Sequence, residues 1–190
     1  MPDKLRVGVA LCGSFCTYAA VLPQIESLCR EFDVTPIMSN TAFQTDSRFG
    51  KAEDFVNRLE EMCGKKVRST ITETEPIGPK GLLDVLVVAP ATGNTLAKLA
   101  NGIADGSVTL AVKAHLRNER PVVLAISTND ALGAAAKNIG ALLNMKHIYF
   151  VPFRQDDPLA KPRSAVADMS KIRDTVLAAA KGEQIQPILL

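Results

Sequence analysis

The 190-residue sequence lacks the features that mark membrane, secreted and nucleic-acid-binding proteins. It has no apolar run near the roughly 18 residues that a membrane-spanning helix needs. Its start, MPDKLRVGVALCG, looks like a charged lead into a short strand and not like a signal peptide with a cleavage site. The net charge of +2 is too small to favour a nucleic-acid partner. We therefore expect a cytoplasmic protein that binds neither membranes nor nucleic acid.

Metal-binding side chains are also scarce. Cys12 and Cys16 are close enough in sequence to suggest a metal site, but Cys29 and Cys63 lie far from them and no histidine is nearby. In a reducing compartment we expect all four cysteines to remain thiols. Because a buried free cysteine packs like a small apolar residue, we favour packing or loop roles and predict no metal site.

What the sequence does contain is an alternation of short apolar runs and amphipathic segments. The apolar runs predict six strands, at residues 5–11, 34–38, 67–71, 83–89, 122–126 and 148–151. Apolar residues spaced three and four apart predict helices at residues 18–29, 52–63, 96–103, 108–116, 131–143 and 165–180. We predict one α/β domain over residues 1–190, with a three-layer, doubly wound, mostly parallel six-stranded sheet of the Rossmann or flavodoxin type. The short apolar tail at residues 183–190 is a candidate for docking on a neighbouring subunit.

Polar residues follow the first two predicted strands, where such a sheet binds its ligands. Gly13 and Ser14 follow the first strand, and Ser39 and Thr41 follow the second. A glycine turn at a helix N-terminus exposes backbone N–H groups, so these loops would suit a phosphate. The dinucleotide fingerprint GxGxxG is absent. Polar caps of ordinary strand-to-helix turns would use the same residues, and both interpretations stay open.

The stretch VVAPATGNTLAKLANGIAD, residues 87–105, interrupts an apolar run with small polar residues. It resembles the PASANT motif of the flavin-binding cysteine-decarboxylase family, which includes phosphopantothenoylcysteine decarboxylase and lantibiotic-processing decarboxylases. The alternative is a plain proline turn capped by Thr92. The resemblance implies bound FMN, with Gly93 where the family usually has alanine. The implied FMN-binding residues are Gly13, Ser14, Ser39, Thr41, Pro90, Thr92, Gly93, Asn94, Thr95 and Thr128.

The sequence departs from this family where its decarboxylases carry their chemistry. Those enzymes have a catalytic histidine near the second strand–helix unit and a Pro-x-Met-Asn clamp after the fifth strand. Here residues 39–63 contain no histidine, and the clamp position reads STNDALG at 127–133. His115 is expected at the surface or an interface, and His147 in a structural or interface role. Decarboxylation and prenyl transfer, the activity of a related branch, are both disfavoured, and we identify no catalytic residue.

Residues 124–144 and 151–164 instead resemble the B-subunit family of dipicolinate synthases from spore-forming bacteria. This resemblance implies the oxidation of dihydrodipicolinate to dipicolinate during sporulation, in the mother cell. It also implies a partner, the A subunit of dipicolinate synthase, that binds NAD or NADP, and a homo-oligomer such as a trimer or dodecamer with FMN at subunit contacts. The alternative functions are a noncatalytic partner subunit on a flavin fold and, ranked lower, a flavin prenyltransferase-like or decarboxylase-like enzyme.

A dicarboxylate substrate needs cationic partners. Arg154 and Lys161, in a predicted loop after the sixth strand, could supply them, and Asn129 is a third substrate-binding candidate. Asp156 and Asp157 could neutralise these charges, or one of them could act as a base. A solvated surface loop is the alternative interpretation of this segment.

Overall fold

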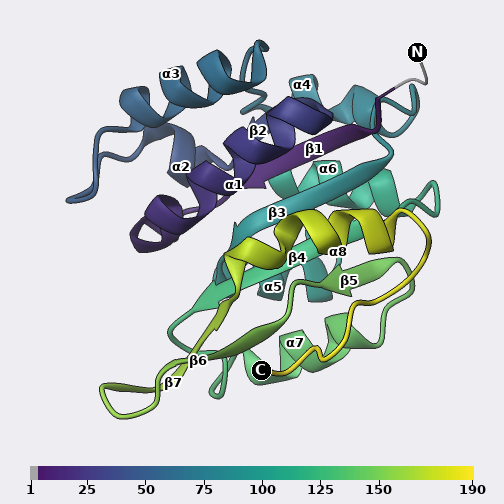
Figure 1. Cartoon of the computed structure of the whole chain (residues 1–190). Coiled ribbons are helices and arrows are strands. Elements are labelled where there is room, and N and C mark those ends of the chain that lie inside the picture. The colour runs from purple at the N-terminus through teal and green to yellow at the C-terminus, as the bar shows by residue number, and fades with distance from the viewer. Residues whose placement is uncertain (1–3) are drawn as a thin grey trace.

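The computed structural model describes residues 4–190, so the first three residues of the predicted charged lead lie outside the described part. A central sheet is covered by helices on both faces (Figure 1). Across the described residues the sheet has seven strands, in the order β2-β1-β3-β4-β7-β6, with β5 also paired to β4. The strands are β1 (Arg6–Leu11), β2 (Asp33–Met38), β3 (Val85–Ala91), β4 (Val122–Thr128), β5 (Ile148–Phe150), β6 (Phe153–Asp157) and β7 (Lys161–Ala167). The doubly wound, mostly parallel sheet is confirmed, with one strand more than expected.

Helices cover the sheet as the apolar spacing predicts. In Figure 1, α1 and α8 lie in front of the sheet, whereas α5, α6 and α7 lie behind it. The α-helices are α1 (Tyr18–Glu31), α2 (Asn40–Gln44), α3 (Ala52–Cys63), α4 (Ile71–Thr74), α5 (Gly93–Ala100), α6 (Ser107–Leu116), α7 (Ala136–Leu143) and α8 (Ile172–Ala179). Short 3-10 turns are η1 (Phe15–Thr17), η2 (Glu75–Ile77) and η3 (Met169–Lys171). All seven residues of β3 are buried, as expected for a strand covered on both faces.

Two predicted elements differ from the structure. The strand expected at residues 67–71 is only a single bridge between Arg68 and Ile37, because Thr70 and Glu73 form a capping box that starts α4. The segment expected as a loop after the sixth strand is a hairpin of β6 and β7. Because β7 pairs with Ser127 and Thr128 at the end of β4, it occupies the beginning of the helix predicted at 165–180.

The C-terminal tail packs on its own chain. The Phe153 N–H donates to the Ile188 carbonyl oxygen, and the Leu190 N–H donates to the Phe153 carbonyl oxygen, both at 3.0 Å. The Gln184 side chain bonds the backbone N–H and carbonyl of Phe150 at 2.7 and 2.8 Å. The tail is therefore an edge segment beside β6, and Leu189 and Leu190 stay exposed on it, so its docking on a neighbouring subunit remains a prediction. No helix in residues 4–190 is long and apolar enough to cross a membrane.

A buried histidine lies in α6, contrary to the expected surface or interface position. His115 is 1% exposed, and its Nε2 atom has no hydrogen-bond partner in the described part of the chain. Burial, and secondarily the positive charge of Arg120, lower the pKa of His115 to about 4. The side chain is therefore neutral at pH 7.

We expect His115 to make the stability of the protein fall in mild acid. Its pKa is about 4 in the folded chain and 6.5 ordinarily, so between these values the unfolded chain binds more protons. Stability that is present above pH 6.5 is then lost as the pH falls toward 4. The free energy of unfolding can be measured in urea at about pH 6.5 and at about pH 4.5. Between these two pH values it should fall by about 2 kcal/mol more in the wild type than in His115→Gln. Parallel pH profiles for the two proteins would contradict this assignment.

Candidate functional site

Two adjoining cavities lie at the carboxyl edge of the parallel strands, where β1 leads into α1 on one face and β3 leads into α5 on the other. This point, where the strand order reverses, is the usual ligand site of such sheets. The cavities have volumes of about 720 and 430 Å³, within the usual range for small-molecule sites. Gly13, Thr92 and Asn94 line both cavities, so the β3–α5 turn forms part of the wall between them.

The β3–α5 turn is shaped by capping and by a close contact with β4. The Thr95 N–H donates to Thr92 Oγ1 at 3.2 Å, which caps the first turn of α5. A Cβ atom at Gly93 would lie 2.7 Å from Thr128 Oγ1, so glycine lets the turn pack against the end of β4. This contact gives a physical reason for glycine where the resembling family has alanine. Pro90 is buried within β3 and lines neither cavity.

The smaller cavity is lined by hydroxyl groups and by one ion pair. Ser39 caps α2, and its hydroxyl accepts the Ala42 N–H at 3.2 Å. Thr41 packs against the Gly13 turn, where a Cβ atom would lie 3.1 Å from its methyl group. Lys98 Nζ lies 2.8 Å from Asp105 Oδ2, and this hydrogen-bonded lysine lowers the pKa of Asp105. We missed Lys98 from the sequence, although its position four residues after Asn94 places both on one face of α5.

Three hydroxyl groups gather in the larger cavity. Ser127 Oγ lies 2.7 Å from Ser14 Oγ and 2.6 Å from Thr17 Oγ1, and the last two atoms are 3.2 Å apart. We call Ser14, Thr17 and Ser127 the hydroxyl cluster. Thr17 and Ser127 are buried, whereas Ser14 is half-buried. Thr17 and Ser127 were not predicted from the sequence, although Ser127 directly precedes the predicted binding residue Thr128.

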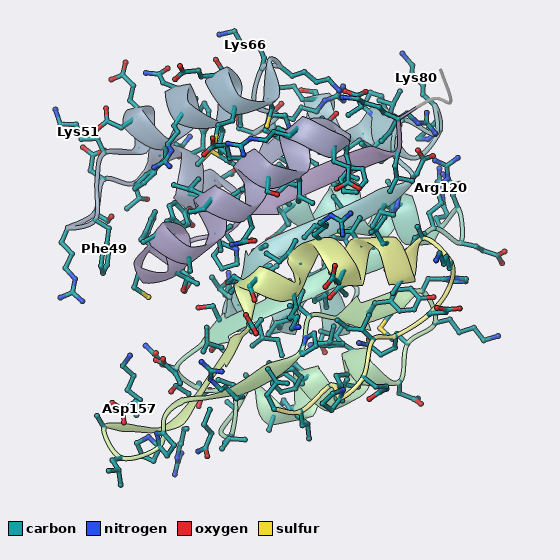
Figure 2. All side chains as sticks on the ribbon, viewed as in Figure 1. Phe49, Lys51, Lys66, Lys80, Arg120 and Asp157 are labelled. Carbon is teal, nitrogen blue, oxygen red and sulfur yellow. The ribbon has the colours of Figure 1, made fainter. Side chains whose placement is uncertain are left out.

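The β6–β7 hairpin forms another side of the larger cavity. Lys161 lines this cavity and pairs with Asp156, with Nζ 2.6 Å from Oδ2. The hydrogen bond to the Asp156 carboxylate raises the pKa of Lys161 and so favours its charged form. Asn129 also lines this cavity, whereas Arg154 is exposed on β6 and lines neither cavity. Figure 2 labels Asp157, which lies at the projecting end of the hairpin.

The lining of the two cavities is suited to binding and orientation. Among residues 4–190, neither a histidine nor an arginine lines either cavity. Burial raises the pKa of the Cys12 thiol to about 11, so this lining group stays protonated at neutral pH. Hydroxyls, amides and a glycine turn fit a ligand that carries a phosphate and hydroxyl groups. The charged candidates for proton transfer are Asp130 and two lysine–aspartate pairs, Asp156–Lys161 and Lys98–Asp105.

Comparisons with known proteins identify the family of the chain. Residues 1–181 match the family model described as Flavoprotein. The chain is 47% identical over 186 residues to the B subunit of dipicolinate synthase from Bacillus subtilis (strain 168), covering 97% of this chain and 93% of that protein. The crystal structure of the B subunit of dipicolinate synthase from Bacillus halodurans has a TM-score of 0.90 and 44% identity, covering 99% of this chain and 97% of that one.

A more distant solved structure is the FMN-dependent cysteine decarboxylase TvaF from thioviridamide biosynthesis. It has a TM-score of 0.66 and 25% identity, and the match covers 94% of this chain and 99% of TvaF. The family model and the full-length relatives extend across every element that forms the two cavities. The chain belongs to the flavoprotein family, in the branch that contains the dipicolinate synthase B subunits.

Proposed function

We propose that this chain acts as the B subunit of a dipicolinate synthase. With a nicotinamide-binding A subunit that carries NAD or NADP, it oxidises dihydrodipicolinate to dipicolinate during sporulation, in the mother-cell cytoplasm. The observation that carries this proposal is the near full-length similarity to two dipicolinate synthase B subunits. The two cavities at the strand edge support it, because they offer room and polar groups for a cofactor and a small substrate.

We propose that FMN occupies the smaller cavity and extends past the β3–α5 turn. Ser39, Thr41 and Thr95 would hold the phosphate with hydroxyl groups, aided by the Lys98 charge. The remaining contacts would come from Gly13, Ser14, Thr92, Gly93, Asn94 and Thr128. Pro90 would act from within β3 by shaping the turn. When bound, the flavin supplies an acceptor for hydride, and the protein binds and orients both molecules.

We propose that the substrate lies in the larger cavity. Lys161 would hold one carboxylate by a charge-assisted hydrogen bond, with Asn129 as a neutral donor beside it. The hydroxyl cluster, which lines the same cavity, would donate to the second carboxylate. Arg154, exposed on the same hairpin, is proposed as an outer contact for the incoming dianion.

The chain is also proposed to form a trimer or dodecamer, in which the exposed Ile103 after α5 would be covered.

A second candidate is a noncatalytic subunit that stabilises its partner. The observation that favours it is the scarcity of proton-transfer groups in both cavities of the described chain.

We expect the purified protein to bind FMN in an absorbance titration, and dihydrodipicolinate to bleach the bound flavin when the A subunit is present. Failure to bind FMN, together with unchanged activity of the two-subunit enzyme, would favour the noncatalytic role.

Asn94→Asp should weaken FMN binding. Asn94 lines both cavities, so a carboxylate there would repel the phosphate and remove an amide donor. Like charges brought together cost several kcal/mol, so the dissociation constant should rise at least about tenfold. Flavin fluorescence titration measures this change. Asn101→Asp, at the other end of α5 and outside both linings, is the matched control. Equal affinity of both variants for FMN would show that Asn94 does not contact the cofactor.

Lys161→Ala should raise the KM for dihydrodipicolinate in the reconstituted two-subunit reaction. The expected rise in KM is roughly threefold to tenfold. It is modest because Lys161 is partly exposed and its ammonium group is already paired with Asp156 before the substrate carboxylate binds. Lys146→Ala, an exposed lysine before β5, is the matched control. Arg154→Ala measured in parallel tests the outer contact. If Lys161→Ala leaves the KM unchanged, Lys161 does not bind the substrate, and the hairpin is a solvated surface segment.

A further inference from the structure

Two cysteines lie close together at the amino edge of the sheet, the edge opposite the two cavities of the proposed site. The sulfur atoms of Cys29 and Cys63 are 3.4 Å apart. Both thiols line a third cavity of about 870 Å³, together with residues at the amino ends of β1 and β2. Both side chains are half-buried, so small molecules can reach them from this cavity.

The helices hold these two thiols in place. Cys29 lies near the end of α1 and Cys63 is the last residue of α3, and these helices pack against each other. Gly64, in the left-handed conformation at φ 63°, ends α3 directly after Cys63. The chain then turns through the loop that carries Lys66, which is labelled in Figure 2. The proximity of the sulfur atoms thus comes from regular, packed elements.

The hydrogen bond between the two sulfur atoms, together with burial and a nearby ammonium group, makes the two thiols unequal. The hydrogen bond with Cys63, and secondarily the nearby Lys65 ammonium, lower the pKa of Cys29. The same hydrogen bond, together with burial, raises the pKa of Cys63. Lys65 is held there by Asp33, with Nζ 2.6 Å from Oδ1. Cys29 is therefore the thiol that more readily ionises, and a thiolate is the reactive form of cysteine.

We propose that Cys29 and Cys63 form a redox-active dithiol that a peroxide converts to a disulfide. The Cys29 thiolate attacks one oxygen of hydrogen peroxide, the O–O bond breaks, and the other oxygen leaves as water after taking up a proton. The resulting Cys29 sulfenic acid is attacked by Cys63. The S–S bond forms, the S–O bond breaks, and the second oxygen leaves as water with the Cys63 proton. Two thiols are oxidised by two electrons, and one peroxide is reduced to two waters.

The bond would close residues 29–63 into a covalent loop. That loop contains β2 and the Ser39–Thr41 segment that lines the smaller cavity. A disulfide restricts the unfolded chain, so the oxidised protein should have a higher thermal midpoint than the reduced protein. The inference does not depend on the proposed function, since the thiols lie outside both cavities of that site.

The test is peroxide treatment of the purified full-length protein, followed by mass spectrometry. The wild type should become about 2 Da lighter and yield a peptide that links Cys29 to Cys63, and dithiothreitol should reverse both changes. Cys16→Ser, which removes an exposed thiol, is the matched control and should still form the bond. Cys63→Ser should instead accumulate a Cys29 sulfenic acid that dimedone labels.

The wild-type peptide map does not depend on the folding of any variant. If Cys29 and Cys63 remain reduced while the exposed Cys16 is oxidised, the dithiol is not redox-active and the proposal is overturned. A disulfide that joins a different pair of cysteines would overturn it as well.

Discussion

The close packing of Gly93 against Thr128 is the contact on which the arrangement of the strand edge depends. With no Cβ atom at residue 93, the β3–α5 turn reaches the end of β4. The turn then separates two cavities that share its residues, one facing α2 and the other facing the hairpin. A side chain at this position would have to displace either the Thr128 hydroxyl or the turn itself, and both line the larger cavity.

The two cavities differ in position but handle charge in the same way. In each, a lysine is already paired with an aspartate on a nearby segment, Lys98 with Asp105 and Lys161 with Asp156. A ligand anion must therefore compete with a resident carboxylate for the ammonium group. The smaller lining is thereby near neutrality when no anion is bound, whereas Asp130 gives the larger lining one more carboxylate than ammonium groups. In both cavities, hydroxyl groups and amides are the donors that no carboxylate pairs with in this way.

Sequence patterns predicted the parts of the fold that local periodicity determines. The five parallel strands and the helix at residues 52–63 were found because burial on fixed faces imposes their apolar spacing. The β6–β7 hairpin was missed because its pairing with the end of β4 is a tertiary contact that leaves little trace in a polar segment. The predicted third strand was wrong because a capping box overrode a short apolar signal.

The candidate site likewise has a part that local sequence predicts and a part that depends on tertiary contacts. The residues after β1, β2 and β3 could be predicted, because each directly follows an identifiable strand. The hydroxyl cluster could not, since Ser14 and Ser127 are 113 residues apart and meet only when β1 and β4 are both in place.

The pairing of residues 188–190 with Phe153 connects the end of the chain mechanically to the hairpin that lines the larger cavity. Phe153 begins β6, which pairs with the strand that starts at Lys161. A force applied at the C-terminus would therefore be transmitted along an edge strand to one wall of the larger cavity. A bulky group fused after Leu190 would therefore load an edge segment that is hydrogen-bonded to the hairpin of the larger cavity.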